Sequence, residues 1–216
     1  MTARIVLARH AEPETWAHGR AIGRTDVGLS REGSRQARAL ASRLSAHGVD
    51  RVVSSPAARA LRTAASIVRA CDLPLEVDAD LREMDFGALD GRTFASIQRE
   101  HPQFYATWMR SPTVVSFPDG ESWTSLRERS ERAMERIAAG GDGQTTVVIT
   151  HLGVMLATLA RVLPAADEDI FTIVIRHTQT CTVDVDDGAW LAHLEGVSHR
   201  RSLPNSQPRR SRAARR

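Results

Sequence analysis

The chain has 216 residues, which fits one large α/β domain better than two small ones. Hydrophobic residues make up 42% and charged residues 25%, so a sizeable buried core is expected. The net charge of +3 comes from one end. Residues 198–216 hold seven arginines and no acid, and without them 22 basic residues face 26 acidic ones. This distribution argues against a basic nucleic-acid-binding domain, since only the tail is positively charged.

Cysteines and apolar runs bear on the compartment. Cys71 and Cys181 have no metal-binding spacing, which favours a reducing environment. The apolar run at residues 5–8 is too short for a signal peptide, and the run at residues 145–163 is interrupted by His151 and Arg161. We therefore expect a cytoplasmic protein with no membrane partner.

The first 70 residues alternate between strand and helix patterns. A β-branched run at residues 5–8 predicts a buried strand, and Ser30 is a candidate cap of an amphipathic helix that ends at Gly48. Residues 51–54 predict a second strand, and Pro56 marks the start of a second helix. Such alternation favours a parallel sheet with helices on both faces.

The later elements continue this pattern after an interruption. Residues 81–122 are loop-rich and predict a lid-like excursion over one end of the sheet. A helix is expected at residues 122–139, a buried strand at 147–150 and a helix at 153–163. The fold class expected is therefore a three-layer α/β/α sandwich with a mainly parallel sheet.

The C-terminal part predicts a hairpin and a tail. Two β-type runs, at residues 182–185 and 190–194, flank Asp187-Gly188, a typical hairpin turn. Residues 198–216 are rich in Arg, Ser and Pro and are expected to be disordered. The domain is accordingly placed at residues 1–197.

Basic side chains follow three of the predicted strands. His10 ends the first strand, His151 ends the strand at residues 147–150, and Arg59 and Arg62 come soon after the strand at 51–54. Ligands of open parallel sheets bind beyond the carboxyl ends of the strands. Three basic sets at one edge predict an anion pocket.

A phosphomonoester matches this chemistry. It is nearly dianionic at neutral pH, and Arg forks bind phosphate oxygens in pairs. A neutral imidazole can attack phosphorus, and the leaving alkoxide then needs a proton. Glu83, in a turn-forming segment, is the candidate acid.

Six ordered blocks carry a family resemblance. They are Leu7-Ala8-Arg9-His10-Ala11-Glu12, Gly23-Arg24-Thr25-Asp26 with Gly28-Leu29-Ser30, Ser54-Ser55-Pro56-Ala57-Ala58-Arg59-Ala60, Leu81-Arg82-Glu83 with Phe86-Gly87, Pro118-Asp119-Gly120-Glu121-Ser122, and Val148-Ile149-Thr150-His151. In this order and spacing they resemble the histidine phosphatase superfamily, also called phosphoglycerate mutase-like. The Gly-Arg-Thr-Asp and Leu-Arg-Glu blocks are most similar to the α-ribazole phosphatase and broad-specificity bacterial group.

The resemblance implies roles for individual residues. His10 is the implied phosphate acceptor, Arg9, Arg59 and His151 bind the phosphoryl oxygens, and Glu83 donates the proton.

Four further positions complete the implied site. Gly23 lies beside the pocket, and Leu152 contributes its backbone N–H, whereas Glu121 and Ser122 approach the leaving-group side. Arg62 has no motif match and is interpreted as structural. No metal or cofactor is implied.

The sequence departs from the family pattern at three positions. Ala11 and Leu152 replace glycines that usually follow the two histidines, and Trp16 stands where Asn usually contacts phosphate. Ala11 is costly only if its backbone needs a positive φ.

A phosphatase is favoured over a mutase. Cofactor-dependent mutases of the family have Tyr where this chain has Phe86, and the following insertion offers only Arg92 and Arg99. The partner expected is a small phosphorylated metabolite, with an apolar part suited to the aromatic residues of 94–117. Two alternatives remain open: a phosphoglycerate mutase-type isomerase and a non-catalytic phosphate-binding protein. A homodimer is compatible with the sequence.

The remaining histidines are interpreted as structural. They are His18, His47, His101, His177, His193 and His199.

Overall fold

The computed structural model describes the chain except residues 1, 165, 195–197, 200–208 and 211–216. Within the described part, seven strands form a sheet in the order β3-β2-β4-β1-β6-β7-β9. Their bounds are β1 Thr2–Arg9, β2 Arg51–Ser54, β3 Leu75–Val77, β4 Thr145–Thr150, β6 Thr180–Asp186, β7 Ala189–His193 and β9 Arg209–Arg210.

The sheet is mainly parallel, as the sequence predicts. Strands β3, β2, β4 and β1 pair in parallel, whereas β6 is antiparallel to both β1 and β7. As a result β3, β2, β4, β1 and β7 point one way and β6 and β9 the other. The register of β1 on β4 ends at Arg9 opposite Thr150, so the residues that follow these two strands emerge side by side.

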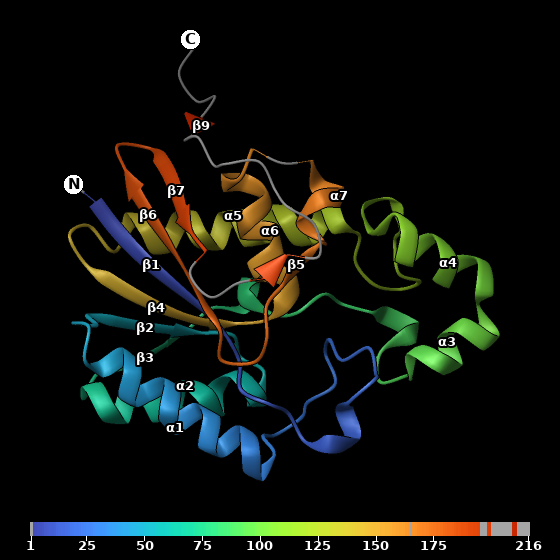
Figure 1. Cartoon of the computed structure of the whole chain (residues 1–216), viewed down its shortest axis with the longest axis horizontal. Coiled ribbons are helices and arrows are strands. Elements are labelled where there is room, and N and C mark those ends of the chain that lie inside the picture. Colours follow the sequence, from blue (N-terminus) through green and yellow to red (C-terminus); the bar gives the residue numbers. More distant parts are fainter. Residues whose placement is uncertain (1, 165, 195–197, 200–208, 211–216) are drawn as a thin grey trace.

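Helices cover both faces of the sheet (Figure 1). On one face, α1 (Arg31–Ser45) and α2 (Ala58–Cys71) bury Leu40, Ala60 and Ile67 against β2 and β4. On the other face, α5 (Trp123–Ala139) and α6 (Leu152–Val162) belong to a larger core cluster. The predicted three-layer α/β/α sandwich is therefore confirmed.

Two helix starts show how local sequence sets these bounds. Ser30 caps α1, because its Oγ accepts the N–H of Gly33 at 2.8 Å. Pro56 lies two residues before α2, which begins at Ala58, later than the sequence predicts. The Ala57 N-cap has no side-chain oxygen, and Oδ1 of Asp26 instead accepts the N–H of Ala58 at 2.9 Å.

The middle segment extends beyond one end of the sheet (Figure 1). It contains α3 (Phe94–Glu100), α4 (Pro102–Arg110) and short 3₁₀ turns at Ala79–Leu81, Gly87–Leu89 and Pro112–Val114. A separate hydrophobic cluster holds it together, in which Phe117 makes edge-on ring contacts with Phe86 and Trp108 at 5.0 Å.

The C-terminal elements include the expected hairpin. β6 and β7 pair around Asp187-Gly188, where both residues have positive φ. A 3₁₀ turn lies at Thr15–Ala17, and α7 spans Asp167–Ile170. Of the predicted tail, Ser198–His199 form β8, which pairs with β5 (Ile173–Val174), and Arg209–Arg210 form β9. The rest of the tail lies outside the described residues.

Candidate active site

The basic residues predicted at the strand ends converge. His10 follows β1 and His151 follows β4, and their ring centroids are 5.1 Å apart. Arg9, His10 and Arg59 line one cavity of about 560 Å³ together with Glu83. The cavity lies at the carboxyl edge of the parallel strands, as expected for this class of sheet.

The hydrogen bond of His10 fixes which ring nitrogen is free. Nδ1 lies 2.8 Å from the carbonyl oxygen of Ala11, which can only accept, so Nδ1 carries the proton. Burial holds the pKa of His10 well below its ordinary value, and the positive charges of Arg59 and Arg9 lower it further. The neutral ring therefore has its lone pair on Nε2.

His151 contacts a serine hydroxyl that can hold its ring in the opposite tautomer. Its Nε2 lies 2.8 Å from Oγ of Ser55, which already accepts the N–H of Ala57 at 3.3 Å. A hydroxyl can accept a second hydrogen bond or donate its own, and when Ser55 donates to Nε2 the imidazole proton lies on Nδ1. Burial, followed by the charge of Arg59, lowers the pKa of His151 well below its usual value. In the tautomer with Ser55 donating, Nδ1 is a neutral donor.

Two buried polar atoms of the site have no partner within the described residues. They are Nε of Arg9 and Nδ1 of His151. A third unpartnered atom, Oε1 of Gln144, belongs to a residue that does not line the cavity. Buried donors are almost always satisfied in folded proteins. Arg9 lines the cavity, whereas His151 is not a lining residue and lies behind it with its ring 5.1 Å from that of His10. The unsatisfied guanidinium N–H of Arg9 indicates a site for an anionic ligand.

Arg59 is held by backbone carbonyls. Its Nη1 donates to the carbonyl oxygen of Thr25 at 3.3 Å, and its Nη2 donates to those of Ile22 and Gly23, both at 3.2 Å. The side chain is only 2% exposed. Burial lowers the pKa of Arg59, and the charge of Glu83 opposes that shift. Because no carboxylate is bonded to it, the guanidinium keeps its charge for a ligand.

Asp90 organises the loop that holds Arg59, and the sequence analysis did not identify it. Its Oδ1 accepts the N–H of Gly23 at 2.6 Å, and its Oδ2 accepts the N–H and hydroxyl of Thr25 at 2.6 Å each. The carbonyls of the same loop bind Arg59. Asp90 thus positions Arg59 without touching the cavity.

Glu83 reaches the cavity from the middle segment. Its Oε1 accepts the N–H of Met84 at 2.9 Å and that of Gly153, in the first turn of α6, at 3.0 Å. Oε2 has only a longer contact of 3.4 Å with the Gly153 nitrogen. Oε2 is therefore the oxygen available to carry or accept a proton.

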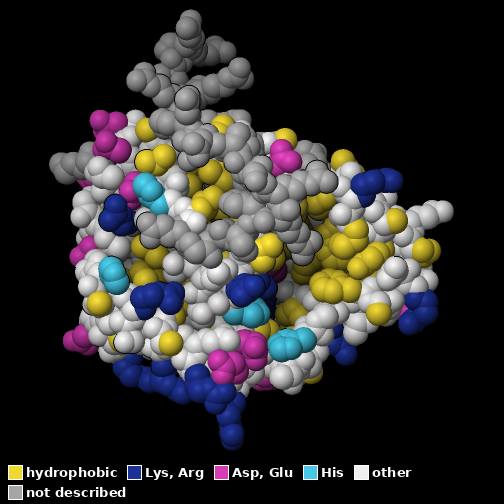
Figure 2. Space-filling model, in the orientation of Figure 1, with side chains coloured by type: hydrophobic (Ala, Val, Ile, Leu, Met, Phe, Trp, Pro, Cys, Tyr) yellow, Lys and Arg dark blue, Asp and Glu magenta, His cyan; other side chains and the backbone are white. Residues whose placement is uncertain are grey.

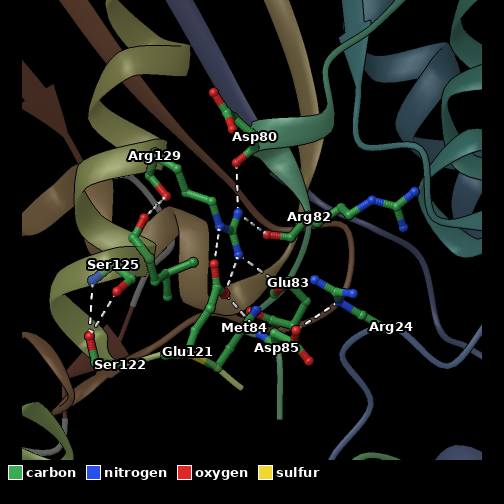
Figure 3. A network of polar contacts seen from close by, with 12 residues as sticks. Arg24, Asp80, Arg82, Glu83, Met84, Asp85, Glu121, Ser122, Ser125 and Arg129 are labelled. Atoms are coloured by element: carbon green, nitrogen blue, oxygen red, sulfur yellow. Dashed lines mark hydrogen bonds and ion pairs between the residues drawn. The ribbon is translucent and has the colours of Figure 1, made fainter. Parts of the chain in front are cut away.

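An arginine behind Glu83 fixes its backbone (Figure 3). Arg129, on α5, donates to the carbonyl oxygen of Glu83 at 2.9 Å and to those of Asp80 and Arg82. The same guanidinium binds both carboxylate oxygens of Glu121, at 2.7 and 2.8 Å. This network locks the acid segment onto α5.

Glu121 and Ser122, which were expected on the leaving-group side, lie in this network or beside it and do not line the cavity. Oε2 of Glu121 also accepts the N–H of Asp85 at 2.9 Å. Burial tends to raise the pKa of Glu121, but the bonds from Arg129 and Asp85 outweigh it and leave the pKa below its ordinary value. Ser122 is the N-cap of α5, bonded to the N–H of Ser125. Neither Glu121 nor Ser122 is among the residues that line the cavity, and their approach to a leaving group stays a prediction.

The sequence of this chain matches a known protein family. The family model of the histidine phosphatase superfamily (branch 1) matches residues 5–197. The chain belongs to this superfamily.

Two curated relatives illustrate what this chain is similar to. A bifunctional protein of Mycobacterium tuberculosis is 39% identical over 150 residues, which cover 69% of this chain and 41% of that protein. The chain thus spans less than half the length of that relative. A protein of Yersinia pestis named probable phosphoglycerate mutase is 31% identical over 191 residues, which cover 87% of each chain.

The fold of this chain is also found in a solved structure. The α-ribazole phosphatase from Shigella flexneri superposes with a TM-score of 0.78 at 24% identity, covering 94% of this chain and 100% of that one. This likeness confirms the phosphoglycerate mutase-like sandwich.

Four other positions that the sequence singled out are Leu152, Gly23, Ala11 and Trp16. Leu152 lines the cavity, and the role expected for its backbone N–H stays a prediction. Gly23 acts indirectly: its N–H binds Asp90, and a Cβ there would lie 2.2 Å from the Met84 carbonyl oxygen. Ala11 is absent from the residues with positive φ, so replacing glycine there carries no left-handed strain. Trp16 is 46% exposed and bonds to Glu14.

Two histidines that were interpreted as structural, His18 and His177, line the cavity. The ring centroid of His177 lies 5.2 Å from that of His10. His177 lies in none of the six motif blocks, which end at His151, and it follows the short strand β5.

The far wall of the cavity is aromatic. Phe86, Phe94 and Trp108 line it, and Phe94 and Trp108 meet edge-on at 5.8 Å. Figure 2 shows hydrophobic side chains gathered over the α3–α4 segment, beside a group of His, Arg and acidic side chains. One side of the cavity is therefore suited to an anion and the other to an apolar group.

Metal-binding groups and membrane-spanning helices are both absent from the described residues. They contain no group of three His, Cys, Asp or Glu side chains placed to hold a metal ion. No helix among them is long and apolar enough to cross a bilayer.

Proposed function

We propose that this histidine phosphatase hydrolyses small phosphomonoesters through a covalent phosphohistidine on Nε2 of His10. One observation carries the proposal. The Ala11 carbonyl holds the proton of His10 on Nδ1, so the Nε2 lone pair is free within a cavity lined by Arg9 and Arg59. A neutral imidazole with an exposed lone pair is a nucleophile.

The first half of the reaction transfers the phosphoryl group. Nε2 of His10 attacks phosphorus and forms the P–N bond while the ester P–O bond breaks, and its electron pair leaves on the alcohol oxygen. Protonated Glu83 gives its proton to that oxygen from Oε2, so the product is a neutral alcohol. Arg9, Arg59 and Nδ1 of His151 bind the three non-bridging oxygens, whose charge they stabilise.

The second half regenerates the enzyme. The Glu83 carboxylate accepts a proton from water as the water oxygen attacks phosphorus. The P–N bond breaks, its electron pair returns to Nε2 of His10, and inorganic phosphate leaves. One ester and one water are consumed, and one alcohol and one phosphate are formed.

Hydrolysis is favoured over mutase chemistry by the cations of the insertion. A mutase must hold a carboxylated intermediate, for which basic side chains beside the cavity are suited. Arg92 and Arg99 instead both pair with Glu100, and neither lines the cavity. The wall opposite His10 is aromatic, which suits an alcohol with an apolar part.

Trapping of the intermediate tests the proposal. The full chain is incubated with a ³²P-labelled alkyl phosphate and quenched in alkali, in which phosphohistidine survives, whereas acid hydrolyses it. We expect label and turnover in the unmodified chain and in His101→Ala, which changes an exposed histidine, and neither in His10→Ala. Turnover that persists in His10→Ala would reject the mechanism.

Two further arms separate the alternatives. A coupled assay with 3-phosphoglycerate and its bisphosphate cofactor detects mutase activity, which we expect to be absent. We also expect EDTA to leave hydrolysis unchanged, since Arg and His supply the positive charge in this mechanism. Loss of turnover with EDTA would show that the mechanism is wrong.

A further inference from the structure

His177 is held at the cavity by a turn with an unusual backbone. The N–H of Gln179 donates to the carbonyl oxygen of Arg176 at 3.1 Å and closes the turn around His177 and Thr178. Thr178 has φ 59°, a left-handed conformation that β-branched residues rarely adopt. Strain of this kind persists only where the surroundings enforce it, and it is concentrated at functional sites.

Three hydrogen bonds enforce the conformation of Thr178. Its N–H donates to the carbonyl oxygen of Arg9 at 3.0 Å, and its hydroxyl donates to the carbonyl oxygen of His177 at 2.7 Å. Its own carbonyl accepts from Nη2 of Arg43 at 3.0 Å. The turn is thus anchored to the residue directly before the nucleophile, and His177 is placed relative to His10.

The ring of His177 presents an acceptor. Nδ1 lies 3.1 Å from the carbonyl oxygen of His10, which can only accept, so Nδ1 carries the proton. Burial, assisted by the charge of Arg9, lowers the pKa of His177 to about 4, so the ring is neutral at neutral pH. Nε2 therefore keeps its lone pair, and no partner for Nε2 is found in the described part of the chain.

An acceptor at this position does not suit the phosphoryl group. The phosphate oxygens of a dianionic ester carry no proton, and the donors Arg9, Arg59 and His151 already serve them. The carboxylate of Glu12 also lines the cavity; its Oε1 accepts the hydroxyl of Ser30 at 2.7 Å, and no hydrogen bond to its Oε2 is found in the described part of the chain. Glu12 therefore keeps a charged acceptor oxygen, whereas His177, directly beside the nucleophile, offers a neutral acceptor that is suited to a hydroxyl hydrogen.

We propose that Nε2 of His177 accepts a hydrogen bond from a second hydroxyl on the leaving alcohol, so that the preferred substrates are phosphomonoesters of diols and polyols. This inference rests on the proposed phosphatase activity and deepens it, because it names the substrate class. His177 is a specificity residue, and the bond it makes selects the alcohol and not the phosphate.

A pair of matched esters tests the inference. 2-Hydroxyethyl phosphate and ethyl phosphate have the same charge and differ by one hydroxyl. We expect the ratio of their kcat/KM values, hydroxyethyl over ethyl, to fall about 5- to 10-fold in His177→Ala, the size of one hydrogen bond. His177→Gln should restore most of the ratio, since its amide oxygen can reach the position of Nε2. His101→Ala should leave the ratio unchanged.

Equilibrium binding separates failure of this inference from failure of the phosphatase proposal. The dissociation constants of both esters are measured on His10→Ala with and without His177→Ala. A matching loss of preference supports the inference even if the chain proves not to be a phosphatase. An unchanged ratio in both assays overturns it and leaves the phosphatase proposal intact. Absence of both binding and turnover for both esters overturns the two together.

Discussion

Gly153 lies so close to Glu83 that no side chain fits between them. Its N–H donates to Oε1 of Glu83 at 3.0 Å, and a Cβ on Gly153 would lie 2.3 Å from the same oxygen. The glycine at the start of α6 therefore both binds the proposed acid and leaves room for it. The end of β4, which lies beside the end of β1 and therefore beside His10, thus also sets the position of Glu83.

Gly153→Ala should disable the acid without touching it. We expect kcat/KM for an alkyl phosphate to fall about 10- to 100-fold, because the methyl group displaces the Glu83 carboxylate. Gly48→Ala is the control: Gly48 has φ 64° and no neighbouring atom within 4 Å, so it should cost about 1 kcal/mol of stability and no activity. Equal activity losses in both variants would contradict this account of Glu83.

Glu83→Gln should reveal the proton donor through the leaving group. Alkoxide leaving groups need protonation, whereas p-nitrophenolate needs little. We expect kcat/KM to fall about 100-fold or more for an alkyl phosphate and no more than about 10-fold for p-nitrophenyl phosphate. Equal losses on both substrates would rule out proton donation by Glu83.

Asp90→Asn should weaken phosphate binding from outside the cavity. The substitution removes the charge that holds the Gly23 and Thr25 N–H groups, and the carbonyls that fix Arg59 lose their support. We expect the inhibition constant of inorganic phosphate to rise about 10-fold. Asp142→Asn, at an exposed position, should leave it unchanged, and an unchanged constant in Asp90→Asn would show that the loop holds without that charge.

Glu121→Gln should change the pH dependence of stability. The folded pKa of Glu121 lies below its unfolded value of about 4.3, so its charge stabilises the fold above that pH, and this contribution is lost as the pH falls through the folded pKa. We therefore expect the two proteins to differ most in unfolding free energy near pH 6 to 7, with the difference shrinking below about pH 4. Denaturant unfolding measures it. A difference that grows in acid would contradict the pairing with Arg129.

Much of the fold was readable from the sequence for a physical reason. Buried parallel strands are continuous apolar runs, and their carboxyl ends meet at one edge of the sheet. The residues that follow β1 and β4, His10 and His151, could therefore be placed together from sequence alone. Ser30 likewise capped its helix as predicted, since capping depends only on residues within one turn.

The sequence by itself determined the reactive groups at the strand ends, and with them the family and the class of chemistry. Only the tertiary structure decided which groups surround them. His177 contacts His10 across 167 residues of chain, Asp90 binds Gly23 across 67, and Arg129 reaches Glu83 across 46. Glu121 is a further example: it binds Arg129 and the Asp85 N–H, 36 residues away, and such packing between segments is recorded by no local pattern.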